Sequence, residues 1–288
     1  MSAPLSFVDA MKLRFSCRTY SGEALEKADA ARLAEAAEAM RTGPFGSRLR
    51  FHLVTAAPGD ERALKKLGTY GTIRGQAGFL IGAAERGPGY LEDYGWALEH
   101  LILEATRIGL GTCWIGGFFT RGTFARRIRV SRRERIPAVA SVGRIINRDK
   151  AQDGLIRRAA GGSRRKPWQA LFHDEEFGRS LAPEETGPWV TALEMVRLAP
   201  SASNRQPWRV VRAGRSWHFY IRRTPGYPPG ISRVLMGIED LQRVDSGIAM
   251  CHFELAAREA GLGGRWVVNQ PGLALPDEHT EYSATWEG

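Results

Sequence analysis

The sequence predicts an α+β protein built from two duplicated halves, and three observations lead to this prediction. A stretch of 22 residues returns at a constant offset of 152 positions. A second stretch, which joins a helix to a strand, returns at an offset of 156 positions. Both copies of each stretch combine helical spacing of apolar residues with short strand-like runs. A period this long exceeds that of solenoid repeats, so it indicates a duplicated half-domain.

The composition is that of an ordinary globular protein. The 288 residues are 43% hydrophobic and 25% charged, which allows one large domain or two smaller ones, each with a core. No apolar run approaches the roughly 20 residues of a membrane helix. The N-terminal segment lacks the hydrophobic stretch of a secretory signal. We therefore expect a cytoplasmic protein with no membrane partner.

The ligand types that hold metals are not clustered in the sequence. Cys17, Cys113 and Cys251 have no metal-ligand spacing and predict free thiols in a reducing compartment. No histidine joins them at the spacing of a zinc site, so we expect no metal. No G-x-G-x-x-G precedes a helix, so a Rossmann site is not supported either.

The net charge of +10 is carried mainly by arginine, since only six of the 41 basic residues are lysine. Arginines cluster in residues 125–136 and 155–168, and guanidinium groups bind phosphate in bidentate fashion. Both runs could line one nucleic-acid face. Neither run is interleaved with the aromatic residues that stack bases, so we expect no nucleic-acid partner.

The longer repeat predicts a helix that enters a strand. Residues 93–114, "DYGWALEHLILEATRIGLGTCW", and residues 245–266, "DSGIAMCHFELAAREAGLGGRW", share ten of 22 positions. Each copy has small and apolar residues at helical spacing and ends at a glycine suited to a C-cap. His100 and His252 occupy equivalent places, and we interpret both as core or interface histidines.

The shorter repeat places a polar loop between a helix and a strand. Residues 199–208, "APSASNRQPW", follow the helical "TALEMVRL" and run into the strand-like "WRVVRA". At an offset of 156 they lie over residues 43–52, "GPFGSRLRFH", where Arg48 and Arg50 replace Asn204 and Gln206. Only the second copy keeps the amide side chains. A purely architectural loop would have had no need to diverge in this way, so the difference favours a functional loop.

The first half has its own distinctive segment, "RFSCRTY" at residues 14–20. Arg14, Ser16 and Arg18 stand at alternate positions, and alternate side chains of an extended segment face the same way. Two guanidinium groups and a hydroxyl on one face suit a phosphate or another anion. The corresponding part of the second half is acidic. The first half therefore supplies the basic triplet, and the second half supplies the amide-rich loop.

Together these motifs resemble the FMN-dependent nitroreductase and flavin reductase family. The R-x-S-x-R segment begins at Arg14, and the family's P-S-S-x-N-x-Q-P-W loop is matched at residues 200–208. The helix that ends in G-L-G and leads to a strand with a glycine pair is matched at residues 109–117, and the R-K-P segment at residues 163–168. The resemblance covers about residues 8 to 270.

The resemblance implies a nitroreductase-like α+β fold in which each half is a small antiparallel sheet flanked by helices. Members of the family are usually homodimers with two flavin sites at the interface, each built from both subunits. This chain is similar to a tandem-fused variant, an intrachain pseudo-dimer, with residues 1–172 and 173–288 as its halves. A monomer would then suffice for the flavin site, and further oligomerisation is left open.

By the same resemblance, one set of residues would bind FMN: Arg14, Phe15, Ser16, Arg18, Trp114, Ile115, Gly116, Gly117, Arg165, Lys166, Pro200, Ser201, Ala202, Ser203, Asn204 and Gln206. Arg14, Ser16 and Arg165 would hold the phosphate through charge-assisted hydrogen bonds, each worth roughly 1.5–3 kcal/mol. Arg18 would lie beside the ring edge where negative charge appears on reduction. No side chain is expected to be catalytic, because the redox chemistry belongs to the flavin.

The remaining assignments follow the same pattern. Asn204 and Gln206 would bond the flavin or neighbouring backbone from the other half, and the glycine pair would let backbone approach the ring. Two departures from the family pattern stand out: Ala202 replaces a serine, and "WIGG" lacks the acidic residue of the usual P-I-E-G strand. A second site around residues 43–52 lacks both the basic triplet and the amides. We therefore expect one FMN per chain.

The function that these features predict is an FMN-dependent oxidoreductase. NADH or NADPH would donate the electrons, and a nitroaromatic, a quinone or free flavin would accept them. Dehalogenation and flavin fragmentation also occur within the same superfamily. The alternative is a non-catalytic flavin-binding protein that stores or senses flavin.

Overall fold

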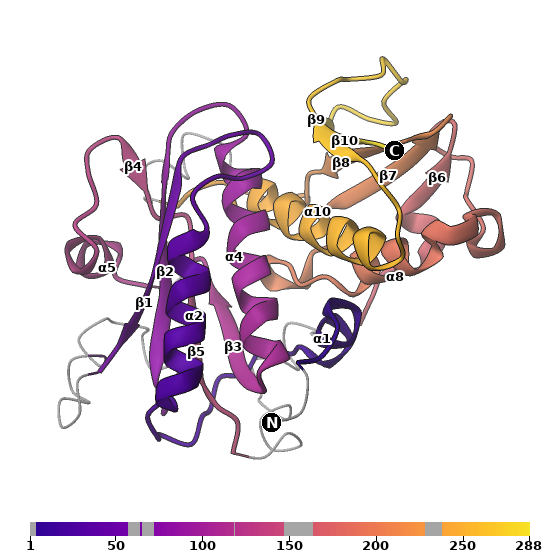
Figure 1. Cartoon of the computed structure of the whole chain (residues 1–288). Helices are drawn as coiled ribbons and strands as arrows, with labels where there is room; N and C mark the ends of the chain where they lie inside the picture. Colours follow the sequence, from indigo (N-terminus) through magenta and orange to yellow (C-terminus); the bar gives the residue numbers. More distant parts are fainter. Residues whose placement is uncertain (1–3, 57–63, 65–71, 118, 147–163, 228–237) are drawn as a thin grey trace.

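The computed structural model describes residues 4–56, 64, 72–117, 119–146, 164–227 and 238–288. The α-helices are α1 (Phe7–Leu13), α2 (Lys27–Ala39), α4 (Tyr90–Arg107), α5 (Arg121–Arg127), α8 (Val190–Leu198) and α10 (Leu241–Glu259). The strands are β1 (Leu49–Thr55), β2 (Gly78–Glu85), β3 (Leu110–Ile115), β4 (Glu134–Arg135), β5 (Val139–Arg144), β6 (Phe172–Asp174), β7 (Trp208–Ala213), β8 (Ser216–Arg222), β9 (Arg265–Val267) and β10 (Thr280–Glu287). Figure 1 shows the two sheets on opposite sides of the molecule, with α4 and α10 between them.

The two sheets have the same strand order. The first sheet runs β1-β2-β5-β3, and the second contains β7-β8-β10-β9 in the corresponding order. All of these neighbours pair antiparallel. The prediction of an antiparallel sheet flanked by helices in each half is therefore confirmed.

One strand departs from this pattern. β6 pairs in parallel with β7, so that Phe172 lies opposite Val210. The strand therefore forms an edge of the second sheet, although the predicted boundary between the halves falls after residue 172, inside β6. The end of the predicted N-terminal half thus reaches across onto the C-terminal sheet.

The two long helices pack tightly against each other where they cross. Gly95 of α4 and Gly247 of α10, which are equivalent in the sequence repeat, lie at this crossing. A Cβ atom added to Gly95 would overlap the Val244 carbonyl oxygen, and one added to Gly247 would overlap the Glu92 carbonyl oxygen. Glycine lets the two backbones approach this closely because it carries no side chain.

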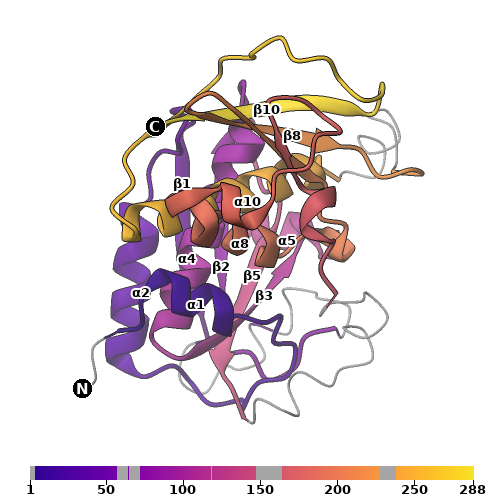
Figure 2. The same ribbon diagram turned by 90° about the vertical axis from the view of Figure 1, so that its right-hand side faces the viewer.

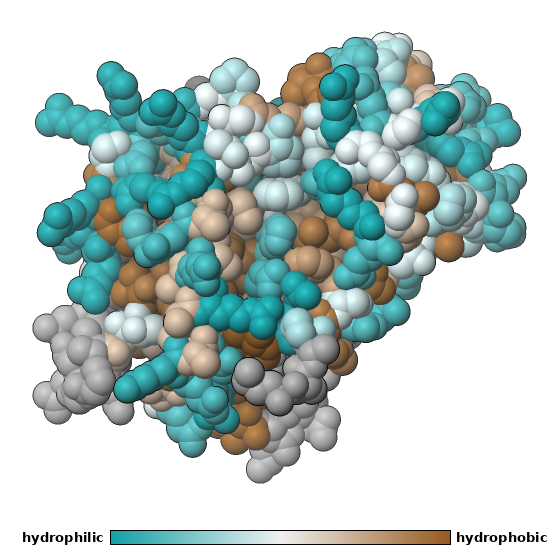
Figure 3. All heavy atoms as spheres, in the orientation of Figure 1, coloured by the Kyte–Doolittle hydropathy of each residue, from teal (hydrophilic) through white to brown (hydrophobic). Residues whose placement is uncertain are grey.

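Apolar side chains fill both faces of the first sheet and the space between the helices. One cluster lies between the first sheet, α2 and α4, and another lies on the opposite face of the sheet, under α5. The largest lies between the second sheet, α8 and α10, and α1 contributes Ala10 and Met11 to it. α1 packs against α4, α8 and α10 (Figure 2). Figure 3 shows mostly hydrophilic side chains around the rim of one face, with hydrophobic residues reaching the surface near its centre.

The helix crossing gives a stability prediction. Gly247→Ala should lower the free energy of unfolding by about 1–3 kcal/mol, because the added methyl group must push two packed backbones apart. The matched control is Gly122→Ala in the exposed part of α5, where no described atom lies within 4 Å of the added Cβ. That substitution should be neutral or stabilising by about 0.5–1 kcal/mol. Chemical denaturation measures both changes, and equal effects of the two variants would contradict the account.

Candidate functional site

The segment after α1 is extended and lies along the edge of the first sheet. Ser16 forms a parallel bridge with Thr112 of β3, and the Cys17 amide donates to the Thr112 carbonyl at 2.8 Å. Phe15 and Cys17 are buried in the core of the first half. The alternation predicted for residues 14–18 is therefore confirmed.

All three polar residues of the triplet, Arg14, Ser16 and Arg18, influence the pKa of Cys113 in the middle of β3. Burial raises the pKa of this thiol, while Arg18, Arg14 and a hydrogen bond from Ser16 oppose that rise. Ser16 therefore lies beside Cys113, and the charges of Arg14 and Arg18 act on the same thiol. The backbone carbonyl of Arg18 accepts from the Arg74 amide at 2.9 Å, whereas its guanidinium makes no hydrogen bond or ion pair with the residues that the structure describes.

Arg14 is a buried guanidinium with unmet hydrogen-bonding capacity. Its side chain is 5% exposed, and its Nε lies 3.5 Å from Oε1 of Glu99. Nε and Nη1 are both buried and have no hydrogen-bond partner among the described residues. Because an unsatisfied buried donor costs roughly 1–3 kcal/mol, an anion at this position would be strongly favoured.

Glu99 connects Arg14 to the second half through contacts that the sequence did not reveal. The indole of Trp114 donates to Oε2 of Glu99 at 2.6 Å. Oε1 of Glu99 lies 2.9 Å from Nε2 of His252, and Nδ1 of His252 lies 2.8 Å from the carbonyl oxygen of Met195. Glu99 and His252 are both fully buried, so the interpretation of His252 as a core histidine is correct. The network joins α4, β3, α10 and α8.

The amide-rich loop has an unusual backbone. Ser203, Asn204 and Gln206 have positive φ angles of 50°, 55° and 48°. This conformation costs free energy for most residues other than glycine and asparagine. Residues strained in this way cluster at functional sites. Within the loop, the backbone amide of Gln206 donates to Oγ of Ser201 at 2.8 Å.

The amide side chains fasten the segment 164–166, which belongs to the first half, to this loop. The Lys166 amide donates to Oε1 of Gln206 at 2.8 Å, and Nδ2 of Asn204 donates to the Arg164 carbonyl at 2.9 Å. Arg165 donates to the Leu198 carbonyl at 2.9 Å and to Oδ1 of Asn204 at 3.3 Å. Asn204 and Gln206 thus bond neighbouring backbone, which is one of the two partners predicted for them.

Lys166 points to a different group of charges. Burial lowers the pKa of its ammonium to about 8, and Arg209, Arg222 and Arg205 lower it further. Its side chain thus lies among cations at the start of β7 and the end of β8. The structure brings Arg165, but not the Lys166 side chain, to the end of α8.

The glycine pair after β3 is only partly open. A Cβ on Gly116 would lie 2.9 Å from Cδ2 of Leu241, so this space is taken by the second half. Gly117 has no described atom within 4 Å of such a Cβ. Ile115 is buried in the core of the first half. Among the predicted residues of this strand, Gly117 therefore offers the clearest room for a ligand.

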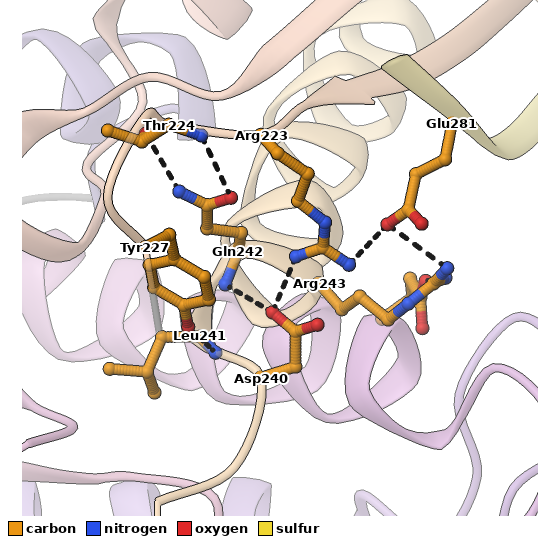
Figure 4. Close-up of polar contacts among 9 residues, drawn as sticks. Arg223, Thr224, Tyr227, Asp240, Leu241, Gln242, Arg243 and Glu281 are labelled. Atoms are coloured by element: carbon orange, nitrogen blue, oxygen red, sulfur yellow. Dashed lines mark hydrogen bonds and ion pairs between the residues drawn. The ribbon is translucent and has the colours of Figure 1, made fainter. Parts of the chain in front are cut away.

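Polar contacts surround Leu241 at the start of α10 (Figure 4), and the Leu241 side chain lies next to Gly116. The Leu241 amide donates to the Tyr227 hydroxyl at 2.9 Å. Asp240 caps the helix and accepts from Arg223 at 2.8 Å. This end of the helix is therefore fixed from both sides.

Two aspartates at equivalent places in the repeat anchor the two loops. Asp93 accepts from the amides of Phe45 and Ser47 at 2.8 and 2.9 Å. Asp245 accepts from the Ala202 amide at 2.9 Å. The sequence signal was present, because both aspartates lie among the ten shared positions of the repeat, although the anchoring role was not predicted.

The residue that replaces Gln206 in the first half has a different partner. Arg50 donates to both carboxylate oxygens of Glu134, at 2.6 and 3.0 Å, and also to the Ile128 carbonyl at 2.8 Å. The pKa of Glu134 falls to about 2, chiefly because of the hydrogen bonds from Arg50. Arg50 thus ties the α5–β4 connection to β1.

Two hollows of the structure lie at or near these elements. A space of about 30 Å³ adjoins Arg14 at the start of β3, which is about the room of one water molecule. A hollow of about 260 Å³ lies between α2 and the end of α4, away from the predicted residues. Its lining consists of Arg32, Leu33, Glu35, Ala36, Ala39, Glu104 and Ile108.

The described residues contain no group of three or more metal-ligating side chains, and all three cysteines are free. No described helix has the length and apolar character needed to cross a bilayer. Of the predicted site residues, Arg14 is linked to α8 through Glu99 and His252. Arg165 contacts the end of α8 and Asn204 of the polar loop.

These features define a two-sheet α+β protein in which buried polar contacts connect α4, β3, α10 and α8. A family model described as "Putative TM nitroreductase" matches residues 6–257. The chain belongs to this nitroreductase family.

One solved structure shares the fold over the whole chain, and two others match about half of it with lower scores. A "putative nitroreductase" of Thermotoga maritima MSB8 is 21% identical and superposes with a TM-score of 0.59, covering 99% of this chain and 95% of its own. An "FMN-dependent nitroreductase" of Clostridium difficile R20291 is 20% identical, with a TM-score of 0.38 over 48% of this chain and 87% of its own. A "putative nitroreductase in complex with FMN" of Desulfovibrio desulfuricans is 21% identical, with a TM-score of 0.40 over 49% of this chain and 87% of its own. No curated protein matches the sequence.

The loop anchor gives a prediction with a definite sign. Burial raises the pKa of Asp245 well above its ordinary value, against the hydrogen bond from Ala202. The folded state therefore holds this proton more tightly than the unfolded state, and stability falls as the pH rises above the ordinary aspartate range. Asp245→Asn should raise the free energy of unfolding at pH 7 by on the order of 1 kcal/mol and weaken that pH dependence.

The matched variant Asp93→Asn should lower the free energy of unfolding instead, although burial raises the pKa of Asp93 as well. Asp93 accepts from two backbone amides, so the asparagine leaves one amide without an acceptor at a cost of roughly 1–3 kcal/mol. Urea denaturation between about pH 4 and pH 8 separates the two cases. A loss of stability in Asp245→Asn at every pH would contradict the assignment.

Proposed function

We propose that this chain binds one FMN at the junction of its halves and acts as an FMN-dependent oxidoreductase. NADH or NADPH would supply electrons, and a nitroaromatic, a quinone or free flavin would receive them. Membership of the nitroreductase family supports redox chemistry on a small molecule. The named FMN-dependent and FMN-bound nitroreductases carry the suggestion of the cofactor only as analogues.

The observation that carries the proposal is the state of Arg14. A guanidinium that is buried, cationic and short of two hydrogen-bond acceptors fits an anionic group. Ser16 and Arg18 lie on the same face of the segment, next to Cys113. The residues present therefore fit the phosphate of FMN, with Arg14 and Ser16 as its anchors and Arg165 approaching from the end of α8.

The other residues would hold the ring. The strained loop that would contact the ring consists of Pro200, Ser201, Ala202 and Ser203. Hydrogen bonds of Asn204 and Gln206 maintain its shape. Gly117 would give the ring room on the β3 side, and Arg18 would face the edge where negative charge appears on reduction. When bound, FMN would supply two-electron redox chemistry between the nicotinamide donor and the acceptor.

We further propose that the chain is a tandem duplication whose halves, residues 1–172 and 173–288, have diverged. Three observations support this. Four strands of each sheet follow the same order, and Gly95 and Gly247 lie at equivalent places in the helix crossing. Asp93 and Asp245 anchor the two equivalent loops. One chain would then hold the interface that the flavin needs, so a monomer is sufficient.

The second junction would bind no flavin. In its loop Arg50 stands at the position equivalent to Gln206. Its guanidinium bonds to Glu134 and to backbone carbonyls instead. The segment that corresponds to the basic triplet, around residues 172–189, contains Asp174, Glu175 and Glu176, of which Asp174 pairs with Arg179 and Arg212. An acidic segment repels a phosphate, so the duplication leaves one working site.

The phosphate assignment gives the test of the proposed function. Arg14→Ala should weaken FMN binding by about ten- to a hundredfold, the loss of one charge-assisted bond of roughly 1.5–3 kcal/mol. Riboflavin lacks the phosphate, so its affinity should stay within about twofold of the wild type. Fluorescence titration measures both ligands, and Arg127→Ala in the exposed part of α5 serves as the charge-matched control.

Equal weakening of FMN and riboflavin by Arg14→Ala would show that Arg14 does not hold the phosphate. Steady-state NADH and NADPH oxidation with several acceptors then tests turnover. Flavin binding without turnover would make the chain a storage or sensing protein. Absence of flavin binding in the wild type would overturn the proposed function itself.

A further inference from the structure

Glu99 and His252 form a buried pair beside the proposed phosphate anchor. Both side chains are fully buried, and Oε1 of Glu99 lies 2.9 Å from Nε2 of His252. Arg14 approaches the same carboxylate oxygen at 3.5 Å. The charge that Arg14 presents to a ligand therefore depends on the charge of this pair.

The hydrogen bonds around the pair fix its proton count. The Met195 carbonyl can only accept, so Nδ1 of His252 carries a hydrogen and donates to it. The Trp114 indole can only donate, so it leaves no proton on Oε2. A hydrogen bond between Nε2 and Oε1 then requires one proton between them. Whichever atom holds that proton, the pair as a whole is neutral.

A neutral pair leaves the positive charge of Arg14 without compensation. In the alternative state, which lacks the shared proton, Glu99 is an anion beside a neutral His252. That anion would neutralise Arg14 and compete with an incoming phosphate. The difference between the two states is one unit of charge in a buried setting, where charges interact strongly.

The other ionisable groups around the pair have partners or stay neutral. On α10, burial raises the pKa of Cys251 well above its ordinary value, so this thiol is uncharged. Glu254 accepts from Arg258 and from two indoles. On α4, Glu104 pairs with Arg107.

The remaining elements that pack here add no free charge. On α8, Glu194 pairs with Arg197. On β3, burial raises the pKa of Cys113, so its thiol is neutral. His100 lies one turn from Glu104, and burial lowers its pKa, which keeps it uncharged. Lys166, with a pKa of about 8, also changes charge as the pH rises, but the charges that lower its pKa are those of Arg209, Arg222 and Arg205. The shared proton is the change of charge in direct contact with Arg14.

We propose that His252 is a positioning residue for flavin binding, because the proton it shares with Glu99 leaves the Arg14 guanidinium free to bind the FMN phosphate. This proposal rests on the proposed function. Without the shared proton Glu99 is an anion that pairs with the Arg14 cation and so weakens FMN binding. FMN bound at high pH therefore takes up one proton into the pair.

The phosphate of FMN titrates with the opposite sign and can be separated. Its second pKa is about 6, so its dianion, the better partner for Arg14, forms as the pH rises. Above about pH 7 this contribution is complete. A fall in FMN affinity at higher pH, absent for riboflavin, then reports the protein and not the ligand.

Two substitutions should act in opposite directions. His252→Gln removes the proton donor and leaves Glu99 to pair with Arg14, so FMN affinity at pH 7 should fall by about tenfold. Glu99→Gln removes the competing anion, so FMN affinity should equal or exceed that of the wild type and should no longer fall at high pH. A purely structural role predicts weaker binding in both variants. His100→Gln, at the equivalent place in the repeat, is the control and should keep the wild-type pH profile.

The experiment is a fluorescence titration of the full-length wild type and the three variants with FMN and riboflavin, from about pH 5 to pH 9. A wild-type pH profile in His252→Gln, or weakened binding in Glu99→Gln, would overturn the inference while leaving the proposed function intact. If a variant fails to fold, calorimetry of wild-type FMN binding above about pH 7.5, in buffers of different ionisation enthalpy, decides instead. Proton uptake supports the inference, and no proton exchange overturns it.

Discussion

The close crossing of α4 and α10 is the contact on which the rest of the structure depends. Gly95 and Gly247 allow backbone to touch backbone there, and the crossing fixes how the two sheets face each other. One turn beyond it, Glu99 comes within reach of His252. The same geometry carries Leu241 to Gly116. A polar site between two halves therefore follows from a steric property of two glycines.

The polar groups at this junction are costly, and that cost shapes what the junction can do. A buried guanidinium or carboxylate loses its hydration and needs partners in return. Glu99 obtains hydrogen bonds from Trp114 and His252. Two nitrogens of Arg14 have no hydrogen-bond partner among the described residues. An apolar junction would be simpler to stabilise. The placement of Arg14 is understandable if part of the stability of the folded chain comes from an anion that binds to it.

Local sequence patterns predicted the elements well, because each pattern is set by near neighbours. The strand read at "WRVVRA" is β7, residue for residue, and both long helices end at the glycines that close the repeat. The alternation of Arg14, Ser16 and Arg18 also held. These features depend on side-chain period and on the freedom of glycine at the end of a helix.

Contacts between distant segments were not predictable in the same way. The parallel pairing of β6 with β7 joins strands that belong to different predicted halves, and three residues carry too little pattern to reveal it. The Glu99–His252 pair spans 153 positions, and its glutamate is not shared by the two copies of the repeat. The backbone of Lys166 bonds to Gln206, 40 positions away, and its ammonium is influenced by Arg209 and Arg222 of the second sheet. Such features emerge only when tertiary packing is known.

The central claim is that one chain contains a complete flavin site built from both of its halves. Size-exclusion chromatography of FMN-reconstituted protein, with light scattering and flavin absorbance recorded together, tests it most directly. The account predicts one FMN on a particle with the mass of a single chain, retained on dilution. Flavin carried only by a dimer and lost as that dimer dissociates, or two equivalent FMN molecules per chain, would contradict it.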